Sequence, residues 1–489
     1  MSTVPPAAGY AGTVRQPAFW MFAGLVAYGL FTLGQSFAAA FGNYPFAATV
    51  AVIVWALYAL PFIAIIRSLD YLEPEPPGMM GAALAWGGLV ATSQAVVANR
   101  AVFSILTKLF LTDFAGEWGA AIAGPTTEET LKTLGVVAIV LLARRHVNSV
   151  TDGVVYGALV GLGFQVVEDM IYSFNAVTSA GRGDQLGPVL LIFLVRGFVG
   201  GLWSHTIYSA IAGAGVAYAV VRRDRPLPVR VGVALIAYTL AWLVHFLWNS
   251  PLVTTWFDAL GWGGTFVAMV CKGVPVLLLF WVIAGTAGQR EAAFYTARLR
   301  AVGSPEIATE GELAALRSLG ARIRTQWAAY VLGGLAAWLA LRRLQRAQAN
   351  LAVELSRTAP AADPPAADPD AAEPAPWYLA GPDISPDLVR LAAEIRAARL
   401  QLSATGFPVV TAPPPRRTFA GWVSIVAGAL CLAFPLLVLV PLALLGSGLA
   451  AARRTGRTAD LKLALGVLVG LTTAAMWLVS TAVATMGAG

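Results

Sequence analysis

Pairs of acidic residues interrupt two apolar stretches of the sequence. Glu128 and Glu129 lie in the first stretch, and Glu168 and Asp169 lie in the second. A charged side chain at the centre of a bilayer costs at least ~2.5–3.5 kcal/mol, so carboxylates inside membrane spans usually mark a site. On a helix, Lys132 falls beside both glutamates, three and four residues further on. We expect one of these glutamates to act as a general base or acid.

Two histidines also lie inside apolar stretches. His245 and Asn249 are four residues apart and therefore share one face of a helix, whereas His205 lies on another helix. Counted to the basic edge of each helix, Glu128, Glu168, His205 and His245 are 15 to 18 residues deep. At ~1.5 Å per residue, all four reach a similar depth of roughly 22–27 Å. The sequence therefore predicts that four helices share one polar cavity, nearer the face opposite the basic loops.

The composition indicates a membrane protein that crosses the bilayer several times. Of the 489 residues, 58% are hydrophobic and only 12% are charged, whereas soluble domains average about 25% charged residues. The net charge of +7 comes from Lys and Arg in the loops between apolar stretches, which is typical of cytoplasmic loops and not of nucleic-acid binding. Cys271 and Cys431 both lie in apolar stretches and form neither a disulfide framework nor a metal-ligand pattern.

The lengths of the apolar stretches predict an all-α fold. After an N-terminal tail (residues 1–16), residues 17–288 hold about eight spans, and the long stretch 188–221 is expected to break near Leu202. The segments that follow are a helical segment (289–357), an Ala/Pro/Asp-rich linker (358–384), a short helix with a linker (385–417) and a membrane unit of two to three helices (418–489). The basic loops place residues 289–417 in the cytoplasm and the protein in the cell membrane.

Several motifs together resemble the PrsW family of intramembrane proteases, which is related to the CAAX prenyl endopeptidases. The motifs are the acidic-proline loop DYLEPEP at 70–76, the Glu-Glu-x-x-Lys at 128–132, the run DGVVYG at 152–157 that continues to Glu168, the His205 helix with its glycines, and His245 four residues before Asn249. Asp169 stands where the family often has Asn, and Asn249 stands where some members have Asp. The resemblance covers residues 69–249.

The resemblance implies hydrolysis of a peptide bond in or near the bilayer. The substrate is then a membrane-anchored protein, such as an anti-sigma-factor-like regulator, and the lipid bilayer is the other partner, without nucleic acid. In a glutamate-dependent mechanism, Glu128 or Glu129 acts as general base on a water molecule and Lys132 fixes the pair. His245 and Asn249 would donate hydrogen bonds to the tetrahedral oxyanion.

A metal-dependent mechanism is the alternative. His205 and Glu168 would either orient the water or, together with His245, form a His₂Glu site for Zn²⁺. The sequence has no His-Glu-x-x-His helix and does not choose between the two mechanisms.

Two other functions fit intramembrane charges. A proton or cation transporter would favour an inverted repeat with broken helices at matching positions, and the sequence shows none. A non-catalytic scaffold would use the same polar groups only to join its helices.

Overall fold

The structure is a computed structural model that describes residues 15–142, 144, 146–358 and 386–408. Every regular element among these residues is a helix, which confirms the predicted all-α fold. Several predicted segments lie outside the described residues. They are the N-terminal tail except residues 15 and 16, the linker 358–384 except Thr358, and the membrane unit 418–489, which includes Cys431.

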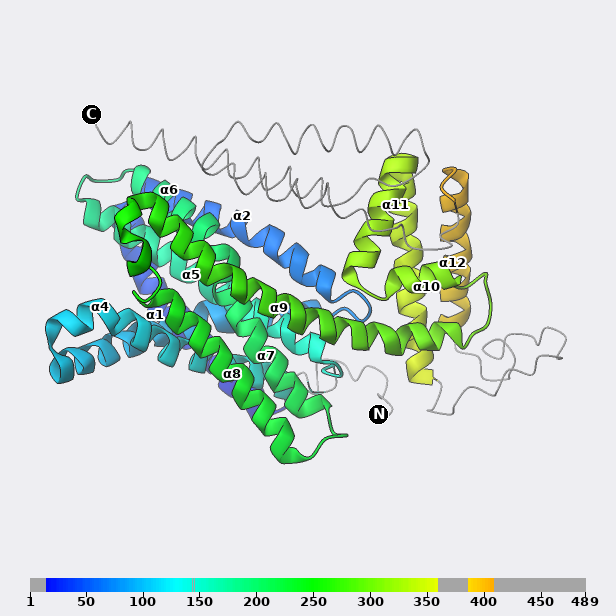
Figure 1. The fold of residues 1–489 in the computed structure, drawn as a ribbon, viewed down its shortest axis with the longest axis horizontal. Helices are drawn as coiled ribbons and strands as arrows, with labels where there is room; N and C mark the ends of the chain where they lie inside the picture. Colours follow the sequence, from blue (N-terminus) through cyan, green and yellow to red (C-terminus); the bar gives the residue numbers. More distant parts are fainter. Residues whose placement is uncertain (1–14, 143, 145, 359–385, 409–489) are drawn as a thin grey trace. The chain divides into compact units, whose positions relative to one another are not determined.

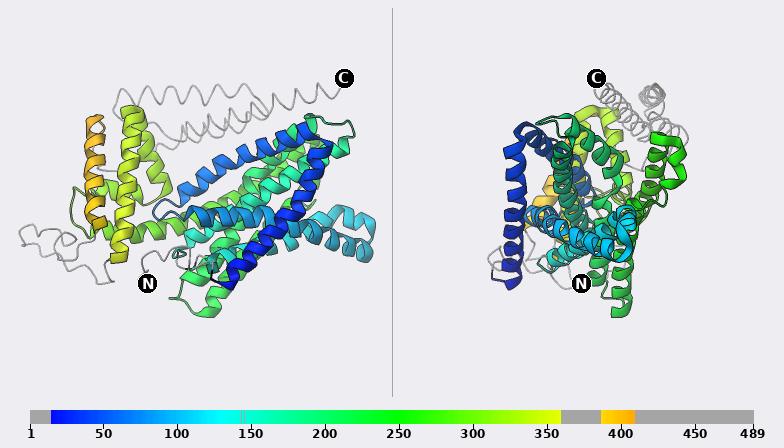
Figure 2. Two further views of the ribbon diagram at one scale, coloured as in Figure 1. Left: turned by 180° about the vertical axis from the view of Figure 1, so that it is seen from behind. Right: turned by 90° about the vertical axis from the view of Figure 1, so that its left-hand side faces the viewer.

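In the described part of the chain, seven helical segments are long and apolar enough to cross a membrane. They are Pro17–Asn43 (α1), Pro45–Leu69 (α2), Pro77–Leu142 (α3, η2 and α4), Val150–Ala180 (α5), Gly187–Val221 (α6, η3, η4 and α7), Leu227–Asn249 (α8) and Val267–Arg300 within α9 (Gly261–Arg300). Large apolar side chains such as Trp20 and Phe31 are exposed on α1, which lies along the outer side of the bundle in Figure 2. The chain is therefore a multi-pass membrane protein.

The third of these segments folds back on itself. It joins α3 (Pro77–Ala85), η2 (Trp86–Ala91) and α4 (Thr92–Leu142) over 66 residues, which would extend about 100 Å as one straight helix. Leu111 has φ 69° and ψ 168°, and this non-helical backbone reverses the chain within α4 (Figure 1). The two arms together count as one of the seven candidate spans among the described residues, whereas the sequence predicted about eight spans in residues 17–288.

Helix α5 is the centre of the bundle, and 83% of the residues in its most apolar stretch of 18 are buried. Its glycines allow α7 (His205–Val221) to pack directly against it. A Cβ atom on Gly157 would lie 2.1 Å from the carbonyl oxygen of Ser209, and one on Gly161 would lie 2.2 Å from that of His205. Small residues of this kind permit close helix packing in membranes. This contact fixes the start of α7 beside the second half of α5.

A capping box begins helix α5. Ser149 is the N-cap, and Asp152 is the third helical residue. Asp152 Oδ2 accepts the backbone N–H of Ser149 at 2.9 Å, and the Ser149 hydroxyl accepts the N–H of Asp152 at 3.2 Å. Both residues therefore satisfy the open N–H groups of the helix.

The stretch before α7 is irregular, as the sequence predicted for residues 188–221. It passes through α6 (Gly187–Ile192), the π-helix η3 (Phe193–Gly200) and the 3₁₀ turn η4 (Gly201–Trp203). Ser204 then has φ −103° and ψ −134°, which ends the turn. His205 is consequently the first residue of α7.

The chain divides into two compact units. Of the described residues, one unit contains 15–70 and 74–288, and the other contains 71–73, 289–358 and 386–408. In the second unit, α11 (Leu319–Thr358) packs against α12 (Pro386–Ala404) through buried residues such as Leu344, Leu351 and Ile395.

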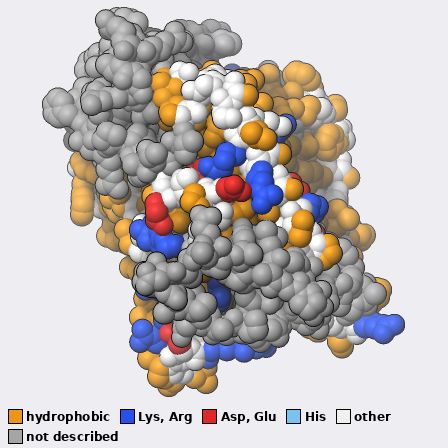
Figure 3. All heavy atoms as spheres, turned by 90° about the vertical axis from the view of Figure 1, so that its right-hand side faces the viewer, with side chains coloured by type: hydrophobic (Ala, Val, Ile, Leu, Met, Phe, Trp, Pro, Cys, Tyr) orange, Lys and Arg blue, Asp and Glu red, His pale blue; other side chains and the backbone are white. Residues whose placement is uncertain are grey.

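The second unit also has a charged surface. The predicted short helix after residue 385 is α12, and its exposed Arg390 pairs with Asp387 and Glu394. Basic and acidic side chains lie next to one another on the face shown in Figure 3. Helix α10 (Glu310–Leu316) begins with a capping box formed by Thr309 and Glu312. Such a mixed, charged surface is typical of protein that faces water.

Candidate active site

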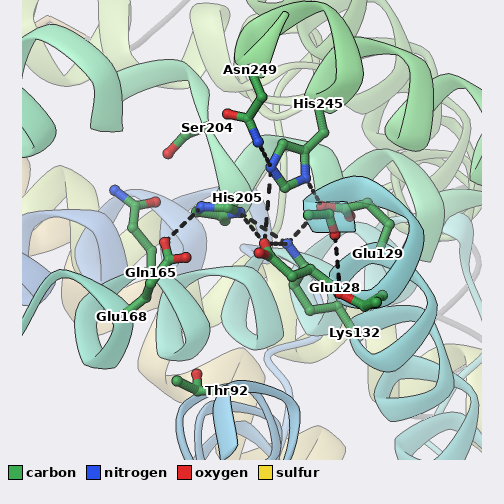
Figure 4. A network of polar contacts seen from close by, with 12 residues as sticks. Thr92, Glu128, Glu129, Lys132, Gln165, Glu168, Ser204, His205, His245 and Asn249 are labelled. Carbon is green, nitrogen blue, oxygen red and sulfur yellow. Dashed lines mark hydrogen bonds and ion pairs between the residues drawn. The ribbon is translucent and has the colours of Figure 1, made fainter. Parts of the chain in front are cut away.

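The structure brings the predicted site residues together at one cavity inside the first unit (Figure 4). Helix α4 provides Glu128, Glu129 and Lys132, α5 provides Glu168, α7 provides His205, and α8 provides His245 and Asn249. The cavity has a volume of about 570 Å³, and all of these residues except Glu129 and Lys132 line it.

Glu129 and Lys132 form the buried base of the site, and both side chains are fully buried. Lys132 Nζ donates to Glu129 Oε1 at 2.6 Å. The same carboxylate oxygen lies 2.8 Å from His245 Nδ1. Glu129 is therefore held by two partners and holds the His245 ring in turn.

The partners of His245 determine the protonation of its ring. A carboxylate only accepts hydrogen bonds, so Nδ1 carries the proton that is donated to Glu129. On the other side of the ring, Nε2 accepts from the amide of Asn249 at 3.1 Å. The amide nitrogen of Asn249 also donates to the carbonyl oxygen of Ala120 at 3.2 Å. The lone pair of His245 therefore points toward the cavity.

His205 is held as the opposite tautomer. Its Nδ1 lies 2.9 Å from Lys132 Nζ, and its Nε2 lies 3.1 Å from Glu168 Oε2. An ammonium group only donates, so Nδ1 is the acceptor and Nε2 carries the proton donated to Glu168. The two imidazoles thus use opposite nitrogens to present a lone pair to the same region.

Glu128 lies at the point where these lone pairs converge. Its Oε1 accepts from the side-chain amide of Asn99 at 2.9 Å, and Asn99 in turn accepts from the hydroxyl of Thr127. Its Oε2 is buried and has no hydrogen-bond partner among the described residues. This oxygen lies 3.8 Å from His205 Nδ1 and 3.9 Å from His245 Nε2. His205 Nδ1 and His245 Nε2 already accept from Lys132 and Asn249, so Glu128 Oε2 is the acceptor that still requires a donor such as water, or a cation.

The converging atoms also suit a metal ion. One ligand atom each from Glu128, His205 and His245 lies within 4.8 Å of the others, and His₂Glu is a known donor set for catalytic zinc. Glu129 and Glu168 bind the far nitrogens of the two rings, as carboxylates commonly do behind metal-bound histidines. Metal binding requires Lys132 Nζ to leave His205 Nδ1 and the Asn249 amide to leave His245 Nε2, because each of these ring nitrogens has one lone pair.

The carboxylate in this donor set differs from the predicted one. The sequence reading grouped Glu168 with His205 and His245, but the structure groups Glu128 with them. Glu168 faces the Nε2 side of His205, away from the converging lone pairs, and its Oε2 is also bound by Arg196 at 2.6 Å. The residue count along the helix predicted the depth of Glu168 but not the direction in which its side chain points.

Three residues that contact the site were missed by the sequence reading. Asn99 binds Glu128, and Tyr208 stacks on the His245 ring with centroids 5.2 Å apart. Arg196 bridges Glu168 and Asp169. One signal pointed to Arg196, because it is the only Lys, Arg, Asp or Glu between residues 187 and 221.

The comparison with protein families agrees with this geometry. Residues 75–286 match the family described as PrsW family intramembrane metalloprotease. This part of the chain belongs to the PrsW family. No curated protein and no solved structure matches the chain. The PrsW segment contains the whole network at the cavity, and the family's activity makes the chain a peptidase that acts at the membrane.

Proposed function

We propose that this PrsW-family peptidase cleaves a membrane-anchored protein and that Glu128 activates the attacking water. The observation that carries the proposal is Glu128 Oε2, a buried oxygen that lines the cavity and has no hydrogen-bond partner in the part of the chain that the structure describes. A water molecule in this space would donate to Glu128 and transfer its proton to the same oxygen. The hydroxide that results is the nucleophile for the peptide carbonyl.

Of the two adjacent glutamates, Glu128 fits the role of general base better than Glu129. Glu129 Oε1 is occupied by Lys132 and His245. Glu129 Oε2 also lacks a partner among the described residues, but Glu129 does not line the cavity. We therefore assign Glu129 to holding His245 and Lys132 in place.

Asn249 is the group that supports an oxyanion. The sequence reading gave this role to His245 and Asn249 together, but His245 Nε2 is an acceptor in its present tautomer. The side-chain amide of Asn249 lines the cavity, and its two N–H groups donate to His245 Nε2 and to the carbonyl oxygen of Ala120, so one of them would have to turn to the oxyanion. One such donor contributes about 2.7–4 kcal/mol of transition-state stabilisation.

A zinc ion would be held by Glu128, His205 and His245. When bound, it would polarise the peptide carbonyl and lower the pKa of a water molecule. Glu129 and Glu168 would then keep the two rings oriented with their lone pairs toward Glu128. Whichever chemistry applies, the chain's own residues have the same tasks of fixing the two tautomers and excluding bulk water.

The position of the cavity among helices that can span a membrane supports a substrate that is itself in or at the bilayer. We propose a membrane-anchored regulator of the anti-sigma-factor type. The Lys/Arg-rich loops support an orientation in the cell membrane that places residues 289–417 in the cytoplasm. The site would then lie nearer the outer face.

The full chain in liposomes, with a single-span fluorescent substrate, tests the proposal. Glu128→Gln keeps the size of the side chain but cannot accept a proton, and we expect cleavage to fall by about 10³-fold. Glu117→Gln on the same helix is the control, because Glu117 is exposed and does not line the cavity. Wild-type cleavage by folded Glu128→Gln would contradict the assignment.

The same assay separates the two mechanisms. After exhaustive chelation and dialysis, a metal-dependent enzyme loses its activity and regains it with Zn²⁺. Activity that survives chelation would favour the glutamate mechanism.

A further inference from the structure

Arg196 lies in an irregular segment that other helices hold in shape. The π-helix η3 and the turn η4 leave carbonyl groups without their usual helical partners. The hydroxyl of Tyr58 donates to the carbonyl oxygen of Gly197 at 2.8 Å. The side-chain amide of Gln165 donates to that of Gly201 at 3.2 Å. Side chains from α2 and α5 thus fix the backbone on both sides of Arg196 and set its direction.

The guanidinium of Arg196 contacts three residues of α5 at the cavity wall. Its Nη2 donates to Glu168 Oε2 at 2.6 Å, and its Nε donates to Asp169 Oδ1. The group also lies over the ring of Tyr172, with 3.8 Å from its central carbon to the ring centroid. A planar fork of donors can hold two adjacent carboxylates at once, which a lysine ammonium cannot do with the same geometry.

Glu168 connects this clamp to His205. The single oxygen Oε2 accepts from Arg196 Nη2 and from His205 Nε2 at 3.1 Å. Because a carboxylate bound to a guanidinium is an acceptor only, the ring nitrogen that faces it must carry the proton. The other ring nitrogen then has a lone pair and lies 3.8 Å from Glu128 Oε2.

We propose that Arg196 is a positioning residue that selects the tautomer of His205 by holding Glu168 against its Nε2. Arg196 acts through Glu168 and does not touch the reacting atoms. The selected tautomer presents the Nδ1 lone pair to the space beside Glu128, where it accepts from Lys132 or binds a metal. Without the guanidinium, Glu168 Oε2 is no longer held at Nε2, and Lys132, which donates to Nδ1 at 2.9 Å, is left as the one partner that favours this tautomer among the described residues, so that the second tautomer gains population. The inference rests on the proposed role of this cavity in hydrolysis.

Nuclear magnetic resonance of ¹⁵N-histidine in the full chain tests the tautomer directly. The chain has only three histidines, so His146→Asn and His245→Asn are sufficient to assign the signals. We expect the wild-type His205 to be protonated at Nε2 alone. Arg196→Gln should give a mixture of tautomers, and Arg196→Lys, which keeps the charge but not the fork, should give a smaller change. If both variants retain the wild-type His205 spectrum, the inference is wrong.

Two further variants separate a positioning role from a general loss of structure. Asp169→Asn leaves the contact between Arg196 and Glu168 in place and should not change the His205 signals. Arg222→Gln removes an arginine that pairs with Asp224 in a loop outside the site, and it should change neither the signals nor cleavage. A shift in either control would show that the His205 signals report general disturbance and would contradict the inference.

Kinetics distinguish this inference from the proposed function. We expect Arg196→Gln to lower kcat by about 10- to 100-fold with KM nearly unchanged, because a misplaced catalytic group affects the chemical step. A changed tautomer with wild-type kcat would contradict the role of His205 in hydrolysis and leave the positioning intact. An unchanged tautomer beside an inactive Glu128→Gln would contradict only the positioning.

Discussion

Two regions of the cavity wall contain the same kinds of residue but bind them differently. At 128–129 on α4 and at 168–169 on α5, two adjacent acids face one cation, Lys132 or Arg196 respectively. Lys132 is at hydrogen-bond distance from only one of its acids, at 2.6 Å, and lies 3.8 Å from the other. Arg196 donates to both of its acids.

The difference follows from the shapes of the two cations. An ammonium group is a compact charge, whereas a guanidinium is a planar fork that binds neighbouring carboxylates together. As a result, one oxygen of Glu128 in the first region lines the cavity without a partner among the described residues. In the second region, Glu168 has both Arg196 and His205 as partners. We therefore propose that the first region reacts and that the second holds the His205 ring in place.

Removal of Lys132 should have the largest effect on this comparison. Lys132 and Glu129 are both fully buried, and breaking a buried ion pair by removing one partner costs about 3–5 kcal/mol. We expect Lys132→Met to lower the thermal unfolding temperature in detergent markedly and to abolish cleavage. Lys108→Met, at an exposed position of the same helix, should have little effect. An unfolding temperature equal to that of the wild type would show that Glu129 does not depend on Lys132.

Gly124 tests whether the first region needs open space, and we expect an effect on activity alone. A Cβ atom there would lie 3.1 Å from Asn249 Nδ2, 3.5 Å from Glu128 Oε1 and 3.7 Å from His245 Nε2. Gly124→Ala should therefore lower kcat/KM by roughly 10- to 100-fold, since small misplacements of reacting groups are costly. The unfolding temperature should not fall, because Ala favours a helix by about 1 kcal/mol over Gly.

Gly116 is the matched control for this change. It lies on the same helix, and nothing is within 4 Å of a Cβ atom built there. Gly116→Ala should cleave at the wild-type rate. Equal losses in both variants would mean that helix α4 responds to any added methyl group, and that the space beside Glu128 is not special.

The sequence predicted the all-α fold and many of the residues that meet at the site. Charged side chains are costly to place in a bilayer, so those inside apolar stretches indicated a site. The number of residues between each group and the basic loops predicted a common depth for Glu128, Glu168, His205 and His245. The break before His205 was visible because residues 188–221 are too long for one span and contain glycines.

The directions of the side chains could not be predicted in the same way. Which carboxylate joins the two imidazoles depends on the rotation of α4 and α5 about their axes, and the residue count does not determine that rotation. Asn99 reaches Glu128 only because the chain reverses at Leu111, and a leucine is not a usual residue for such a turn. The contact of Arg196 with Glu168 and Asp169 likewise could not be predicted, because it depends on the π-helix in which Arg196 lies.

Removal of the ion pair between Arg222 and Asp224, in the loop between α7 and α8, should have the smallest effect on stability and cleavage. It tests whether burial explains the larger effects expected at the cavity. Arg222 donates to both oxygens of Asp224 at 2.7 and 2.6 Å, and these hydrogen bonds lower the pKa of Asp224 to about 2. The geometry resembles that of Arg196, but Asp224 is exposed, and surface ion pairs contribute little because water screens them.

Asp224→Asn should therefore leave both the unfolding temperature and the cleavage rate unchanged. A lowered pKa means that any stabilisation by the carboxylate is present above its unfolded pKa of about 3.9 and is lost only as the pH falls toward 2, and water screening keeps this contribution small at the exposed Asp224. Between pH 5 and pH 8, the wild type and the variant should thus show the same dependence of unfolding temperature on pH. If Asp224→Asn destabilised the protein as much as Lys132→Met, burial would not be what separates the cavity from the loop.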